Sequence, residues 1–304
     1  MRILNVLRAV AIALAFGLAG CATTAVEEPK AKPKALSVKT PDGVTISAQE
    51  WGNPSGPEIV FLHGFMQSSE SWSRQVNSDL AREFRMITFD FRGHGLSDKP
   101  WDPKFYNDAG RFADELKAVM DAAGLKKPVL VGWSYGSRIL TDYLAKYGSA
   151  NVAGINYVGA AVSGDAKNFG PGIKLLGEAL KEASLAENLD ATRAFLRSCF
   201  ETQPSAADFE TMAMFNMAVP VKVRQWLRRP APYEPTLKAI NVPTLVTHGM
   251  KDQVTLVTLG EYVASTVPNA RSSYYEGVGH SPFWEDPKRF NKELAELVRS
   301  ANKK

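Results

Sequence analysis

The chain has 304 residues, a formal net charge of +4 and two cysteines. This small positive excess is spread along the chain, so the sequence does not indicate a nucleic-acid-binding protein. It contains no His/Cys clusters with metal-ligand spacing, and we expect neither a metal nor an organic cofactor.

The first residues have the pattern of an export signal. A basic start, Met1 to Arg8, precedes an apolar stretch over residues 9–19. This stretch is shorter than the about 20 residues that a transmembrane helix needs, which favours cleavage over permanent spanning. The segment Leu18-Ala19-Gly20-Cys21 resembles the lipobox of bacterial lipoproteins. The alternative is an ordinary secretory signal in which Cys21 has no role.

The lipobox resemblance implies that residues 1–20 are removed and that a lipid on Cys21 anchors the chain to a membrane. Ala22 resembles the choice for the outer membrane, so we expect the periplasmic side of that membrane. Residues 21–35 are polar and contain proline, and they predict a flexible tether. With Cys21 lipidated, Cys199 has no disulfide partner, and its helical pattern predicts a small buried side chain.

From residue 36 to residue 304, strand-like and helix-like segments alternate. Apolar or alternating runs typical of strands occupy residues 44–51, 59–62, 85–89, 128–131, 154–158, 243–247 and 270–275. Helical patterns occupy residues 72–83, 108–123, 134–147 and 287–300. Such alternation predicts one α/β domain with a doubly wound, mostly parallel sheet.

Strand signals are absent from about residue 165 to about residue 235. Helical patterns replace them over residues 173–185, 190–199, 204–217 and 221–228. We expect an inserted helical cap above the carboxyl ends of the strands, where open α/β sheets bind ligands. A basic cluster in this segment is interleaved with apolar residues and is expected to form a solvated helix face; it comprises Lys222, Arg224, Arg228 and Arg229.

The strand-like run at residues 128–131 leads directly into Gly132-Trp133-Ser134-Tyr135-Gly136. Gly-x-Ser-x-Gly between a strand and a helix is the nucleophile elbow of serine hydrolases, a sharp turn that exposes the serine hydroxyl. The two glycines leave room for close backbone packing. Five residues alone also fit an ordinary tight turn, but the strand before and the helix after meet the motif's context. Ser134 is therefore the predicted nucleophile.

A serine nucleophile needs a base and a carboxylate that orients the base, in the order Ser, Asp or Glu, His along such a chain. His280, in a glycine-rich turn before the closing helix, is the predicted base. Asp252, a short turn beyond a predicted strand, is the predicted carboxylate, and Asp165 is the alternative. We expect His248 to be structural.

The backbone N–H groups of Phe65 and Tyr135 are the predicted donors to the oxyanion. Gly64 permits close approach, and His63 is expected to bond backbone groups and hold this loop. The substrate-pocket candidates are apolar, mainly methionine and aromatic: Phe65, Met66, Trp133, Tyr135, Met212, Met214, Phe215, Met217 and Trp226. For the cap residues among them, membership of the core is the alternative.

Together these motifs resemble the α/β-hydrolase superfamily, in particular its capped branch of small esterases and non-haem haloperoxidases. The motifs occur in family order: His63-Gly64, Asp90 to Ser97, Gly132 to Gly136, His248 to Asp252, and Gly279 to Pro287. The resemblance implies cleavage of carboxylic esters of small to medium apolar substrates through an acyl-enzyme. It also implies that Asp90 and Arg92 fix a sharp turn by local hydrogen bonds.

A serine at position 134 differs from the aspartate of haloalkane dehalogenases and epoxide hydrolases and leaves acyl transfer as the chemistry. The same triad would serve two alternatives, a perhydrolase or haloperoxidase-like reaction with peroxide, and acyl transfer to another acceptor. An alternative of another class is a non-catalytic, ligand-binding envelope lipoprotein.

Overall fold

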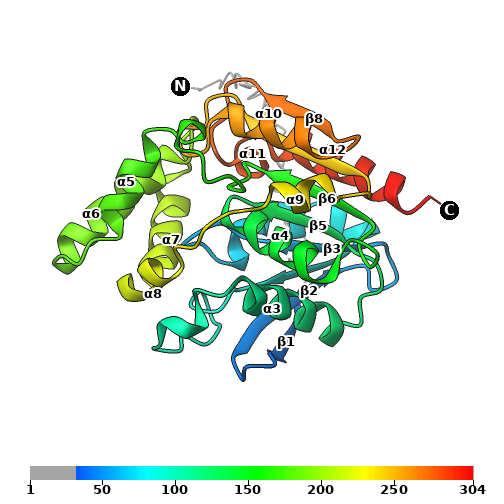
Figure 1. Ribbon diagram of the computed structural model, residues 1–304, viewed down its shortest axis with the longest axis horizontal. Coiled ribbons are helices and arrows are strands. Elements are labelled where there is room, and N and C mark those ends of the chain that lie inside the picture. The colour runs from blue at the N-terminus through cyan, green and yellow to red at the C-terminus, as the bar shows by residue number, and fades with distance from the viewer. Residues whose placement is uncertain (1–31, 304) are drawn as a thin grey trace, which may run out of the picture. The chain divides into compact units, whose positions relative to one another are not determined.

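A computed structural model describes residues 32–303; the predicted signal, the lipidated Cys21 and most of the tether lie outside the described residues. An eight-stranded sheet with the order β1-β2-β4-β3-β5-β6-β7-β8 forms its centre (Figure 1). Strands β3 to β8 run parallel, whereas β2 is antiparallel to both β1 and β4. The predicted fold class is confirmed. Among residues 32–303, no helix combines the length and apolar character needed to cross a membrane.

All strands except the first match predicted segments. They are β1 (Lys34–Lys39), β2 (Thr45–Gly52), β3 (Glu58–Leu62), β4 (Arg85–Phe89), β5 (Val129–Trp133), β6 (Gly154–Val158), β7 (Thr244–Gly249) and β8 (Arg271–Tyr275). Strand β1 was not predictable from the pattern, because Val38 is its single buried residue and the segment shows no apolar alternation. Pairing with β2, rather than side-chain burial, makes this segment a strand.

Helices cover both faces of the sheet. One hydrophobic cluster includes residues of α3 (Ala109–Ala122), α4 (Tyr135–Tyr147), α9 (Glu234–Lys238) and α10 (Val257–Thr266). The other includes residues of α1 (Ser73–Val76), α2 (Leu80–Glu83), α11 (Pro282–Glu285) and α12 (Pro287–Ala301). Along β3, Val60 and Leu62 belong to the first cluster, and Ile59 and Phe61 to the second. Burial on both faces explains why the parallel strands read as continuous apolar runs.

One predicted helix differs from the structure, and the sequence predicted no helix at the positions of α9, α10 and α11. The segment 72–83 forms two short helices, because the Ser78 hydroxyl donates to the Gln75 carbonyl and accepts from the Leu80 amide between them. Helix α10 was not predicted, since its β-branched residues weaken the helical signal. Within residues 32–303 there are also three short 3₁₀ segments: Ser69–Trp72, Pro103–Phe105 and Ala166–Asn168.

Between β6 and β7 the chain forms the predicted run of helices, which lie together to the left of the sheet in Figure 1. They are α5 (Gly172–Ala179), α6 (Leu185–Ser198), α7 (Ala206–Met217) and α8 (Val221–Trp226), and we call them the cap helices. One buried side chain, Arg224 of α8, donates hydrogen bonds to the other three helices and to the connection between α7 and α8. Its acceptors, at 2.7 to 3.3 Å, are the carbonyl oxygens of Ala179, Asn216 and Val219 and the side-chain oxygens of Asn188 and Thr192.

The prediction of a solvated basic face is wrong for two of its four residues. Arg224 and Arg229 are buried, whereas Lys222 and Arg228 are exposed. Arg229 donates to the Asp142 carboxylate of α4 at 2.7 Å and to the Tyr135 hydroxyl at 3.1 Å. These acceptors lie far away in the sequence, so helical spacing alone could not reveal them.

Replacing Arg224 by methionine tests its role in the cap helices. The carbonyl oxygens of Ala179, Asn216 and Val219 would lose a buried donor, so we expect the free energy of unfolding to fall by about 3 kcal/mol. Urea unfolding followed by circular dichroism measures this change. The exposed Lys222, replaced by methionine, is the matched control and should change stability by at most about 0.5 kcal/mol. Equal stabilities of the two variants would contradict this role.

Candidate active site

Ser134 lies in a strained turn between β5 and α4. Its φ is 51° and its ψ is −113°, a region that non-glycine residues rarely adopt. A Cβ added at Gly136 would collide with the carbonyl oxygen of Leu62, and one at Gly132 would lie 2.9 Å from the Ser137 backbone. Both glycines are therefore needed for the close backbone packing that the motif predicts.

The structure brings Asp252 and His280 together. Nδ1 of His280 lies 2.6 Å from Oδ2 of Asp252, and both side chains are buried. Because a carboxylate only accepts, Nδ1 carries a proton in this contact, and Nε2 is the acceptor of the imidazole whenever the ring is neutral. The Trp133 indole N–H donates to the His280 carbonyl at 2.8 Å, and the His280 N–H donates to the Cys199 carbonyl at 3.1 Å. These bonds fix the backbone of His280 on both sides.

Further donors surround the Asp252 carboxylate. Oδ1 accepts from the amides of Val254 and Thr255 at 2.8 and 3.0 Å. Oδ2 accepts from the Thr255 hydroxyl at 2.9 Å and lies 3.2 Å from Nε2 of His248. Burial acts to raise the pKa of Asp252, but the charge of His280 and the hydrogen bonds from His248 and His280 outweigh it and hold the pKa below its ordinary value. The carboxylate is thus kept ionised.

The alternative carboxylate, Asp165, lies elsewhere. It is exposed, accepts from the Lys167 amide at 3.1 Å and forms an ion pair with the Lys167 ammonium at 3.0 Å. Of the two predicted carboxylates, only Asp252 contacts the imidazole of His280.

His63 and His94 hold the loop that carries Phe65. Nε2 of His63 accepts from the Phe91 amide at 3.1 Å, and Nδ1 donates to the Gly64 carbonyl at 2.8 Å. Nε2 of His94 accepts from the Met66 amide at 3.2 Å. Burial lowers the pKa of each imidazole to about 3, so both stay neutral. These contacts give His63 the structural role expected from the sequence.

The turn from Asp90 to Ser97 is fixed partly as the resemblance implies. Asp90 accepts from the Leu96 amide at 2.8 Å, which is the expected local bond. Arg92 is fully buried and reaches distant carboxylates instead, Glu115 at 2.6 Å and Asp42 at 2.7 Å. Its partners are thus long-range rather than local.

A cavity of about 710 Å³ has Ser134 in its wall. Phe65 and Tyr135, the predicted oxyanion donors, line it as well. Helix α5 and the residue that follows it supply an apolar side through Ile173, Leu176 and Leu180, at helical spacing. The other lining residues are Arg138, Ala161, Phe169, Gly177, Lys181, Phe195, Gln225, Leu227, Arg228, Val254 and Thr255.

Two of the predicted pocket residues, Met66 and Trp133, pack away from the cavity. Met66 is fully buried, and Trp133 is buried with its ring against Phe283 and His280 at centroid distances of 4.8 and 5.6 Å. Neither lines the cavity. Both side chains support the loops around Ser134 instead of offering a surface to a ligand.

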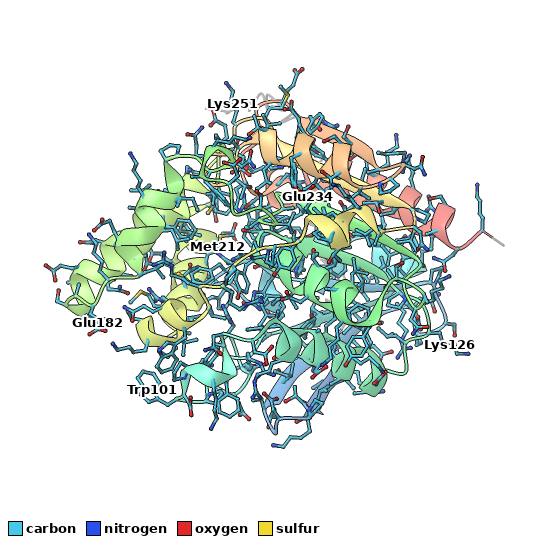
Figure 2. The ribbon with its side chains drawn as sticks, viewed as in Figure 1. Trp101, Lys126, Glu182, Met212, Glu234 and Lys251 are labelled. Atoms are coloured by element: carbon cyan, nitrogen blue, oxygen red, sulfur yellow. The ribbon has the colours of Figure 1, made fainter. Side chains whose placement is uncertain are left out.

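The predicted cap residues do not line the cavity either. Met214 is 64% exposed, and Trp226 stacks on Tyr106 at a centroid distance of 5.8 Å. Phe215 and Met217 are half-buried on α7. Met212, labelled in Figure 2, belongs to the hydrophobic core. For this residue the alternative given for the cap residues, membership of the core, applies. The reason is that α5, rather than α7, provides the apolar wall near Ser134.

Sequence reasoning missed Thr255 and Arg138. Thr255 bonds Asp252 and lines the cavity, but no motif marks a threonine for that role. Arg138 could have been found, because it lies in the first turn of the helix that follows Ser134. Among residues 32–303, no group of three or more His, Cys, Asp or Glu side chains could hold a metal.

Residues 57–287 match a protein family described as alpha/beta hydrolase fold. The chain is 29% identical over 285 residues to a bifunctional esterase/perhydrolase of Acinetobacter calcoaceticus, covering 86% of this chain and 99% of that protein. It is 28% identical over 274 residues to a non-heme chloroperoxidase of Kitasatospora aureofaciens, covering 85% and 98%. Among solved structures, the esterase RhEst1 of Rhodococcus sp. ECU1013 is 33% identical with a TM-score of 0.82, covering 88% and 99%.

The buried neutral His63 predicts a pH dependence of stability. Its pKa is about 3 in the folded state, below the value of about 6.5 expected after unfolding. The stabilisation is therefore present above pH 6.5 and is lost as the pH falls from 6.5 toward 3. In His63→Gln, an amide oxygen can replace Nε2 as acceptor without titrating, so the fall in unfolding free energy should be shallower by up to about 1.4 kcal/mol per pH unit. Urea unfolding at pH 7, 6 and 5 measures the slopes, and an unchanged slope would contradict the prediction.

Proposed function

Because the chain belongs to the α/β-hydrolase fold family, we propose that it is a serine hydrolase that cleaves carboxylic esters through an acyl-enzyme. Ser134 is the nucleophile, His280 the base and Asp252 the orienting carboxylate. The observation that carries this proposal is the buried 2.6 Å contact between Asp252 and His280 together with a cavity that has Ser134 in its wall. The similarity to the Rhodococcus esterase, at 33% identity, supports it.

In the first half-reaction, Ser134 Oγ attacks the carbonyl carbon of the ester while Nε2 of His280 takes the hydroxyl proton. The oxyanion accepts from the amides of Phe65 and Tyr135. Tyr135 is the first residue of α4, so its N–H has no acceptor within the helix and lies at the positive end of the helix dipole. The C–O bond then breaks, and the leaving alcohol receives the proton from His280.

In the second half-reaction, water replaces the alcohol. His280 takes a proton from the water as its oxygen attacks the acyl carbon, and it returns the proton to Ser134 Oγ when the carboxylic acid leaves. Asp252 stays ionised throughout and stabilises the imidazolium that forms in each half. The burial and multiple donors of this carboxylate suit that role.

The cavity suits a small to medium acyl or aryl group. Its volume of about 710 Å³ is that of a small-molecule site, and α5 gives it an apolar side. The apolar wall would hold the carbon chain while the ester carbonyl lies at Ser134.

A perhydrolase reaction is the second candidate, because the Acinetobacter relative is named as an esterase and perhydrolase. Hydrogen peroxide would then replace water in the second half-reaction and give a peracid instead of an acid. The first half-reaction is the same, so peracid formation in the presence of hydrogen peroxide is the measurement that separates the two.

Hydrolysis of 4-nitrophenyl esters from acetate to dodecanoate tests the proposed function. Ser134→Ala should remove essentially all turnover, and Asp252→Ala should lower kcat about 10⁴-fold, because the base loses its orienting carboxylate. Asp165→Ala, which removes an exposed carboxylate of the same type, is the matched control and should keep its activity. Turnover that survives in Ser134→Ala would refute the assignment of the nucleophile. A larger loss in Asp165→Ala than in Asp252→Ala would move the carboxylate role to Asp165.

We further propose that a lipid on Cys21 anchors the protein to the periplasmic side of the outer membrane. In Cys21→Ser the acyl chains have no thiol to attach to, so the protein should move from the membrane fraction to the soluble fraction. Fractionation of cells on a density gradient followed by immunoblotting measures this. Unchanged sedimentation with the outer membrane would contradict the anchor.

A further inference from the structure

The cavity beside Ser134 is positively charged. Its lining residues include Arg138, Lys181 and Arg228 and, within the described part of the chain, no aspartate or glutamate. An entirely apolar substrate gives no reason for the half-buried Arg138 in this wall, because desolvating a donor without a partner is costly. The lining therefore points to an anionic group on the ligand.

Arg138 is the cation nearest to Ser134 in the chain, one turn further along α4. It is half-buried, its Nη2 donates to the Arg229 carbonyl at 3.0 Å, and its Nε is buried without a partner within residues 32–303. Asp142 is already engaged by Arg229 at 2.7 Å and by the Tyr233 hydroxyl at 2.7 Å. Arg138 acts on this carboxylate electrostatically and lies 5.8 Å from the centroid of the Tyr135 ring, but it forms no ion pair among the described residues.

The two other cations differ from each other. Lys181 is 64% exposed and already forms an ion pair with Glu178 at 2.6 Å. Arg228 is exposed, and the ion pairs found among the described residues do not include it. Arg138 and Arg228 are thus the cations of this cavity that form no ion pair among residues 32–303.

We infer that the preferred substrates are esters whose acyl group ends in a carboxylate, which Arg138 and Arg228 bind. This inference rests on the proposed esterase function. A guanidinium matches the planar carboxylate and can donate two parallel hydrogen bonds to it. Arg138 follows Ser134 by four residues and lines the same cavity, so a short dicarboxylic acid such as glutarate would place its ester carbonyl at Ser134 and its carboxylate at the guanidinium. The apolar side chains of α5 would cover its methylene groups.

Two 4-nitrophenyl esters of similar length test the inference. One is the 4-nitrophenyl monoester of glutaric acid, whose second carboxyl group is free and anionic. In the other, that second carboxyl group is a neutral methyl ester. The readout is the ratio of kcat/KM for the anionic ester to kcat/KM for the neutral one, with the Ser134→Ala protein as the blank for spontaneous hydrolysis. We expect the wild-type ratio to be well above one and Arg138→Gln to lower it between about 10-fold and about 100-fold, as for loss of a hydrogen bond to a charged group. Arg138→Lys, which keeps the charge, should retain part of the preference.

Arg228→Gln gives a second variant whose exposed position makes misfolding no concern, and it should lower the same ratio. The matched control is Lys222→Gln, because Lys222 pairs with Glu182 at the outer end of the cap helices, where Figure 2 labels Glu182. That control removes the same charge and should leave the ratio unchanged. In the wild type, 0.5 M NaCl should also lower the ratio by screening.

A wild-type ratio of one or less, with the neutral ester turned over, would overturn the inference and leave the proposed function standing. An equal loss on both esters in Arg138→Gln would overturn it as well, since it would indicate a general structural effect. Turnover of neither ester would overturn the proposed function and the inference with it.

Discussion

The backbone of α4 passes so close to β3 that residue 136 has room only for a hydrogen atom as its side chain. This contact forces the turn before α4 to be sharp and holds Ser134 at a positive φ. Its consequences extend through the site. The serine lies in the wall of the cavity, the first amide of α4 is left without a helical acceptor, and Arg138 follows four residues later in the same wall.

Buried polar groups then connect this turn to the rest of the molecule. The Tyr135 hydroxyl donates to the Leu227 carbonyl at 2.9 Å, and Arg229 joins the same segment to Asp142 of α4 at 2.7 Å. The segment after the cap helices is therefore fixed to the helix that carries the proposed nucleophile. Arg224 fixes the cap helices to each other with carbonyl and side-chain oxygens rather than with a carboxylate. Such satisfied networks favour one arrangement of the chain over others.

The sequence predicted what local chemistry determines. Gly132 and Gly136, the buried strands and the carboxylate after β7 follow from short motifs whose spacing has a steric or chemical reason. Long-range partners were not predictable in this way. Helical periodicity shows that a helix has an apolar side, but not which surface that side contacts. The pattern therefore predicted pocket residues on α7, whereas residues of α5 line the cavity. Likewise, a charged residue at helical spacing looks solvated unless its distant acceptors are known, as for Arg224 and Arg229.

The indole of Trp133 limits which residues position 133 tolerates. Its N–H donates to the buried carbonyl of His280, and its ring lies against Gly64, where an added Cβ would approach it to 2.9 Å. One side chain thus spans three loops, those of the proposed nucleophile, base and oxyanion donor. Any residue fits the motif at the position between its first glycine and the serine. In this structure, however, that position requires a side chain with both a hydrogen-bond donor and a flat surface. Sequence variation at this position is therefore constrained by tertiary packing and not by the motif.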